Sequence, residues 1–472
     1  AAGALNVLAG TSLLNATLNG TPGSDITLNS GSYTFQNLVL NTSLALNNGA
    51  IANVSGGLTV NDSLTINAPT SPTGLILIGS QTVNGSGNII FNGTGNSVLS
   101  EPRLFPSNGT TLTIAPGLNI SGGNGTIGQA FANLVLNNNI DADVSGETLI
   151  IAGSPWSSTG TLGASNGGTL QIGGELNNGG STLTLDTAAG ALNVLAGTSL
   201  LNATLNGTPG SDITLNSGSY IFQDLVLNTG LVLNNGAIAN VSDGLTVNDS
   251  LTINAPTSPT GLHLVTTQTL DGNGIITFNG IGNGVISEPR LFPFSGTTLT
   301  IGPDLTINGG IGTVGQANAT LILTGTVSAS TSNLAVSGTT VTNNGLLEAL
   351  NGSTLSIDNL SGNPGTLHAG ADSTVILFDP LSMTGDSHVL IDIGGPALVG
   401  RISAVSGAAV YDGTATISAV DGYMPNVSDT FIIFNHNGFS GNFDTVNSVG
   451  LGGGESFSIT FDASTGQATV IN

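Results

Sequence analysis

The sequence repeats itself on two scales, and this repetition limits the folds open to the chain more than any other feature. Residues 1 to about 130 recur at 188 to about 317, offset by 187 positions, with about 25 differences between the two copies. A shorter step of about 20 residues lies within each copy, and its matching apolar pairs are Leu38 and Leu58, Leu40 and Val60, Leu44 and Leu64, and Leu46 and Ile66. Fixed periods of this length are typical of solenoid proteins.

Short stretches in which apolar and polar residues alternate predict β-strands with one buried face, because successive side chains of a strand point to opposite sides. Asn, Gly and Asp separate these stretches, and they tolerate the backbone of tight turns. We therefore expect an all-β chain that forms a parallel β-helix (β-solenoid) of about 20-residue coils, each with three short strands. A β-sandwich is the alternative, since it also uses short alternating strands.

The repeats suggest five parts. Residues 1–130 and 188–317 are the two solenoid copies, 131–187 connect them, 318–380 form more divergent coils, and 381–472 form a β-rich closing segment. Differences between the copies, such as Thr34 against Ile221 and Gly56 against Asp243, are expected mostly at turns and outward sites.

The charge balance excludes several classes of function. Among 472 residues there are 27 acidic side chains and 3 basic ones, for a formal net charge of -24. The basic residues are Arg103, Arg290 and Arg401, so Lys is absent. Nucleic-acid binding requires clustered cations, so it is not expected. Disulfides are impossible without Cys, and no apolar run is long enough to span a membrane.

Several stretches resemble repeats of large bacterial β-helical surface adhesins, similar to autotransporter passengers and filamentous-haemagglutinin-like exoproteins. The resemblance lies in residues 141–149, 160–172 and 345–357, and in the closing motifs at 411–413, 422–425, 429–434 and 441–444. It implies an extracellular or cell-surface location and a rod-like, structural or adhesive role.

Residues that could carry chemistry are few. Asp141 and Asp143 would share one side of a strand, as carboxylates do in enzymes that cleave polysaccharides. With no Lys and only scattered Arg, we interpret the two residues as solvated outward acids. The histidines are dispersed and are expected at the surface or at edges: His263, His368, His388 and His436. We predict no enzyme activity, no catalytic residue, no metal site and no cofactor.

Two segments are expected to leave the solenoid. Ser100 to Pro106 and its copy, Ser287 to Pro293, are bracketed by prolines, which interrupt ladder hydrogen bonds. Each is predicted to form a loop in which Glu and Arg pair, either as a lateral contact between rods or as a folded-back flap. Trp156 is predicted to lie in a second kind of loop excursion.

The function expected from these features is mechanical. The chain is predicted to be a rod or filament that assembles with itself, end to end or laterally, with cell-surface glycans as a further partner. The alternative is a β-helix that binds or cleaves polysaccharides.

Overall fold

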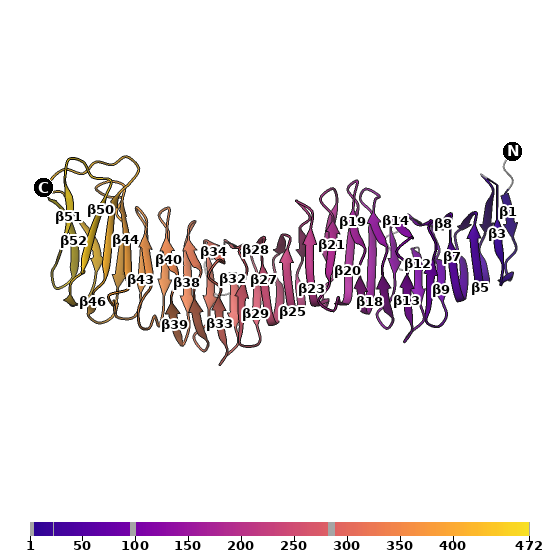
Figure 1. Ribbon diagram of the computed structural model, residues 1–472, viewed down its shortest axis with the longest axis horizontal. Coiled ribbons are helices and arrows are strands. Elements are labelled where there is room, and N and C mark those ends of the chain that lie inside the picture. The colour runs from indigo at the N-terminus through magenta and orange to yellow at the C-terminus, as the bar shows by residue number, and fades with distance from the viewer. Residues whose placement is uncertain (1–3, 22, 95–100, 282–287, 472) are drawn as a thin grey trace. The chain divides into compact units, whose positions relative to one another are not determined.

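The computed structural model describes residues 4–21, 23–94, 101–281 and 288–471, and every regular element in these ranges is a β-strand (Figure 1). The prediction of an all-β parallel β-solenoid is confirmed, with turns of roughly 22 residues. The chain divides into two compact units, Ala1–Val232 and Leu233–Asn472. Ala1, Ser100 and Ser287, which the sequence analysis used, lie outside the described residues.

The strands of the first unit are β1 (Ala4–Val7), β2 (Ser12–Leu14), β3 (Thr17–Asn19), β4 (Asp25–Leu28), β5 (Gly31–Asn41), β6 (Ser43–Leu46), β7 (Ala50–Val60), β8 (Ser63–Ala68), β9 (Thr73–Leu77), β10 (Gln81–Asn84), β11 (Asn88–Gly93), β12 (Pro102–Pro106), β13 (Thr111–Ile114), β14 (Asn119–Gly123), β15 (Gly125–Ile127), β16 (Asn133–Leu136), β17 (Asn139–Ala142), β18 (Thr148–Ser158), β19 (Thr161–Ala164), β20 (Thr169–Asn177), β21 (Thr182–Asp186), β22 (Ala191–Val194), β23 (Ser199–Gly207), β24 (Ile213–Leu215) and β25 (Gly218–Asn228).

The boundary between the units falls within β26 (Leu231–Leu233), and the strands that follow are β27 (Ala237–Val247), β28 (Ser250–Ala255), β29 (Thr260–Leu264), β30 (Gln268–Asp271), β31 (Ile275–Gly280), β32 (Pro289–Pro293), β33 (Thr298–Ile301), β34 (Thr306–Gly309), β35 (Gly312–Gly315), β36 (Thr320–Leu323), β37 (Thr326–Ala329), β38 (Asn333–Ser337), β39 (Thr340–Asn343), β40 (Leu346–Ala349), β41 (Thr354–Ile357), β42 (Thr366–Ala369), β43 (Thr374–Leu377), β44 (His388–Ile393), β45 (Arg401–Ala404), β46 (Ala409–Tyr411), β47 (Thr414–Ala419), β48 (Thr430–Asn435), β49 (Phe439–Gly441), β50 (Thr445–Val449), β51 (Ser456–Phe461) and β52 (Thr465–Ile471).

The step of about 20 residues in the sequence corresponds to the register between one turn of the solenoid and the next. The four predicted pairs are all register partners, Leu38 with Leu58, Leu40 with Val60, Leu44 with Leu64 and Leu46 with Ile66. Their side chains are all at most 1% exposed. Each of these strands therefore buries its aliphatic face while its backbone pairs with the turn before and the turn after, so the core exists only because turns stack.

The two repeat copies begin on different faces of the solenoid. β1 starts the column that continues through β4, β6 and β8 to β21 and the second half of β23. β22 has the same sequence as β1, yet it follows β20 in the column that begins with β2. The long repeat is therefore not a whole number of three-strand turns. The stack accepts this shift since all three faces bury Leu, Ile and Val alike.

The closing segment continues the parallel pairing through β44, β45, β47 and β50, but its last strands pair antiparallel. β48 pairs antiparallel with β52, which pairs antiparallel with β51. Aromatic side chains gather here, with Tyr411 stacked on Phe461 at 4.2 Å between ring centroids. Tyr411 Oη lies 2.8 Å from Nδ1 of buried His436, and His436 Nε2 lies 3.0 Å from the carbonyl oxygen of Asp462. Burial raises the pKa of Tyr411, so this phenol stays neutral.

The prediction that the proline-bracketed segments form loops is wrong in both copies. Pro102–Pro106 is strand β12, and all five residues pair with β9. The missing N–H groups of Pro102 and Pro106 would face β15, which pairs only with Arg103 and Leu104. The prolines thus lie where their neighbour strand has already ended, which is a position that tolerates them. The predicted ion pair is confirmed, at 3.4 Å between Arg103 Nε and Glu101 Oε1.

The predicted loop excursion at Trp156 is also wrong. Trp156 lies in β18, is 1% exposed, and donates a hydrogen bond from Nε1 to the carbonyl oxygen of Gly173 at 3.0 Å. Its register partners on the turns before and after are Leu134 and Leu176. The indole therefore takes the place of a leucine in the stack, with its one polar atom satisfied by the backbone of the next turn.

Candidate functional site

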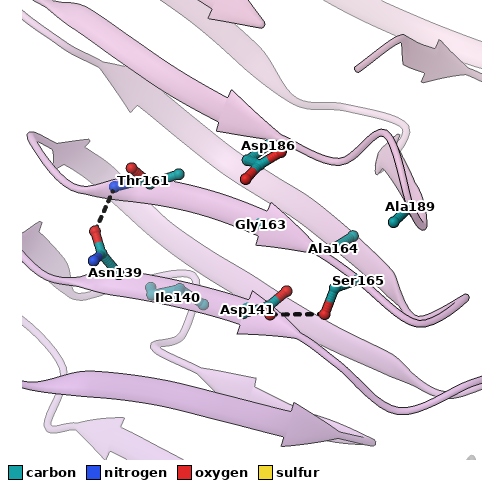
Figure 2. Close-up of a pocket in the computed structure, with 9 residues that line it drawn as sticks. All are labelled: Asn139, Ile140, Asp141, Thr161, Gly163, Ala164, Ser165, Asp186 and Ala189. Carbon is teal, nitrogen blue, oxygen red and sulfur yellow. Dashed lines mark hydrogen bonds between the residues drawn. The ribbon is translucent and has the colours of Figure 1, made fainter. Parts of the chain in front are cut away.

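A shallow depression on the outer surface of the first unit is the strongest candidate for a site. It has a volume of about 370 Å³ and is formed by three successive turns, and its lining residues are Asn139, Ile140, Asp141, Thr161, Gly163, Ala164, Ser165, Asp186 and Ala189 (Figure 2). Asp141 on β17, Gly163 on β19 and Asp186 at the end of β21 are register partners in sequence. Two carboxylates thus flank a glycine, and the strands that carry them are two strand spacings, or roughly 9.6 Å, apart.

Gly163 creates the space between the two acids. A Cβ at this position would lie 3.1 Å from Asp141 Oδ1, so a larger residue would displace the carboxylate. Asp141 Oδ1 is shielded from solvent and accepts no hydrogen bond, while Oδ2 accepts one from Ser165 Oγ at 2.8 Å. Asp186 Oδ1 accepts one from Thr208 Oγ1 at 3.0 Å. Each carboxylate is therefore oriented by a hydroxyl group of the following turn.

The arrangement offers acceptors and no opposing cation among its lining residues. Hydroxyl groups of a ligand could donate hydrogen bonds to such carboxylates. Within the described ranges, no group of three or more His, Cys, Asp or Glu side chains is arranged to hold a metal ion. The depression thus offers the exposed carboxylate of Asp186 as an acceptor, while Asp141 Oδ1 is shielded from solvent.

The predicted acid pair is only partly the pair that the structure forms. Asp141 and Asp143 are both half-exposed on either side of buried Ala142, but Asp143 lies beyond the end of β17. The acid that faces Asp141 across the depression is Asp186, which the sequence analysis missed. Asp186 could have been found from the spacing of two successive turns, because one turn leads from Asp141 to Gly163 and the next from Gly163 to Asp186.

Comparison with known proteins adds no identification. No family model matches the chain, and no curated protein is similar to it. No helix capable of crossing a membrane occurs in the residues that the structure describes.

The prediction that the histidines lie at the surface or at edges does not hold for all four. His388 is exposed and His263 is half-buried, but His436 is 4% exposed within the aromatic cluster of the closing segment. His368 on β42 lies between acids of the neighbouring turns, with Nδ1 3.2 Å from Glu348 Oε2 and Nε2 2.9 Å from Asp392 Oδ2. These contacts raise the pKa of His368 to about 9 despite its burial, so the imidazole is charged at neutral pH.

Proposed function

We propose that the chain is an extracellular structural or adhesive protein whose solenoid subunits associate with one another through uncovered strand edges. The supporting observation is that two segments of identical sequence differ in their strand pairing. Residues 1–33 and 188–220 are identical in sequence. In the second location, the preceding turn covers β22 and β23 through β20 and β21. In the first location, β1, β2 and β3 pair on one side only among the described strands.

The consequence is visible in the exposure of equivalent leucines. Leu5 is 61% exposed, whereas Leu192, its counterpart, is 1% exposed. Leu8 and Leu14 on the same turn are 80% and 49% exposed. Among the described strands, such a parallel edge with exposed apolar side chains is a template for another strand, and we propose that a second copy of the chain supplies that strand. At the other end, β50 has a ladder partner in β47 alone among the described strands, and β51 contacts it through a hydrogen bond from the Phe457 N–H to Ser448 Oγ at 2.8 Å. Contact between two unlike edges is heterologous and can continue without limit.

Concentration-dependent light scattering with electron microscopy tests this proposal. The full chain is expected to form larger assemblies as concentration rises. Leu8→Lys places a charge on the uncovered edge and is expected to lower the association constant at least tenfold. Thr59→Lys is the matched control, because it adds the same charge to a half-exposed outward site within the stack. Monomers at all concentrations, or equal effects of the two substitutions, would contradict the proposal.

A polysaccharide-binding or polysaccharide-cleaving β-helix is the second candidate, and the acid-lined depression is the observation that favours it. If the depression bound or cleaved a glycan, Asp141→Asn and Asp186→Asn would each reduce that activity without changing assembly. Reducing-end assays on a panel of neutral polysaccharides measure this, and no activity in the unmodified chain would remove the cleaving role.

A further inference from the structure

An outward cluster of rings on the second unit distinguishes the two repeat copies. His263 on β29 and Phe292 on β32 are register partners, and their ring centroids lie 5.4 Å apart. Phe294 directly follows β32, lies 6.0 Å from His263 between ring centroids, and is 41% exposed. We call these three residues the aromatic shelf. They face away from the core, since Leu264 and Leu291 beside them are buried.

The first copy has the same backbone arrangement without the shelf. β9 and β12 pair in the equivalent register, with Ile76 opposite Phe105. Ile76 takes the place of His263, and Ser107 takes the place of Phe294. The Arg103 guanidinium there lies 5.1 Å from the centroid of the Phe105 ring. Since the solenoid forms with either set of side chains, folding does not require the shelf.

The imidazole of His263 is available to a ligand. It makes no hydrogen bond within the described part of the chain, and it is only half-buried. Burial and the nearby charge of Arg290 lower the pKa of His263, so the ring is neutral at neutral pH. A neutral imidazole offers one N–H donor and one nitrogen acceptor. The shelf therefore combines two apolar ring faces with one donor and one acceptor.

The charges around the shelf decide which ligand it suits. Glu288 lies 3.2 Å from Arg290 and accepts a hydrogen bond from Thr313 Oγ1 at 3.0 Å, so the local cation is already engaged by an acid. The whole chain carries a formal charge of -24, which repels polyanions. An uncharged ligand with an apolar face and a hydroxyl edge fits both observations.

We propose that the aromatic shelf binds uncharged sugar rings, with the C–H face of a pyranose stacked on Phe294 and Phe292 and its hydroxyl groups bonded to His263. Aromatic faces carry partial negative charge and attract such C–H groups. Phe294 is 41% exposed, so we expect the ligand to be a stretch of polysaccharide that lies across the strands. This inference is independent of self-association, because no residue of the shelf belongs to the uncovered edges.

Saturation-transfer NMR on the full chain tests the inference with three uncharged glucose hexamers of different linkage, cellohexaose, laminarihexaose and maltohexaose. At least one is expected to receive transferred signal, with a dissociation constant on the order of 1 mM for one stacked site. The double variant H263I/F294S installs the residues of the first copy and is expected to reduce the signal at least tenfold. The reciprocal variant I76H/S107F builds a second shelf and is expected to about double it.

Other outcomes overturn the inference. Absence of signal for all three hexamers would do so, as would unchanged signal in H263I/F294S. Equal binding of an oligogalacturonate would contradict selection for uncharged sugars. A change in assembly size in H263I/F294S without a change in sugar signal would assign the shelf to contact between copies. Thermal unfolding of both variants verifies that the solenoid is intact.

Discussion

The Nε2 atom of His368 lies 2.9 Å from Asp392 Oδ2 on the next turn, while its Nδ1 atom contacts Glu348 on the previous one. One charged imidazole thus links three successive turns of the second unit. Since the outer surface of the chain is otherwise made mainly of uncharged polar groups, this linkage is the clearest source of pH dependence in its stability.

The sign of that dependence follows from the pKa of His368, which is raised from 6.5 to about 9 by the two carboxylates. The stabilisation is fully present below pH 6.5 and is lost as pH rises through about 9. Glu348 has a lowered pKa, so its share is lost on the acid side as pH falls below about 4.5. His368→Asn is expected to lower the free energy of unfolding by about 2 kcal/mol at pH 6.

Urea unfolding of the unmodified chain and His368→Asn, at intervals between pH 5 and pH 10, measures this effect. The two stability curves are expected to converge above pH 9. Exposed His388, replaced by Asn, is the control and should leave the curve unchanged. Parallel curves for His368→Asn and the unmodified chain across the whole range would show that the linkage contributes nothing.

Gly122 is predicted to be intolerant of any side chain. Its φ is 125°, and an added Cβ would lie 2.0 Å from the carbonyl oxygen of Phe91 on the previous turn. Gly109 also has positive φ, at 70°, but nothing surrounds its Cβ position. Gly109→Ala is therefore expected to cost about 1 kcal/mol from backbone conformation alone, and Gly122→Ala several times more. Chemical denaturation compares the two, and equal costs would contradict the close approach.

Trp156 is expected to contribute strongly to the core of the first unit. Trp156→Ala should lower the free energy of unfolding by about 4 kcal/mol, because it removes a fully buried side chain from the stack. Trp156→Phe keeps most of the packing but leaves the carbonyl group of Gly173 without the indole donor, so a cost of about 1 kcal/mol is expected. Calorimetry on both variants measures this. A neutral Trp156→Ala would indicate that the residue lies in a surface loop, as first expected from the sequence.

Substitutions in β12 test whether this segment is a paired strand, as in the structure, or a folded-back flap, as the sequence suggested. Leu104 is fully buried, so Leu104→Ala is expected to cost about 3 kcal/mol. Arg103→Gln removes only a partly exposed ion pair and should cost under about 1 kcal/mol. The same contrast is expected at Leu291 and Arg290 in the second copy. Chemical denaturation measures all four costs, and similar small values for the Leu and Arg substitutions would indicate a detachable flap.

The sequence predicted the parts of the fold that depend on repetition. Leu38 and Leu58 share a step that is the stacking register, so the buried face and the parallel pairing followed from it. It did not predict β12, because whether Pro102 and Pro106 interrupt a ladder depends on where β15 ends. The pairing of Asp141 with Asp186 was also missed, since the two turns that separate them are longer than the step from Leu38 to Leu58.

The self-association proposal is tested most directly by hydrogen exchange on peptides that the two copies share. Peptides from within residues 1–33 and 188–220 are chemically identical, so each gives one mass signal from two environments. At low concentration this signal is expected to be bimodal, with the population from uncovered β1–β3 exchanging fast and that from β22–β23 exchanging slowly. Assembly at high concentration is expected to move the fast population to the slow one. A fast population that persists at every concentration would show that these edges take no part in association.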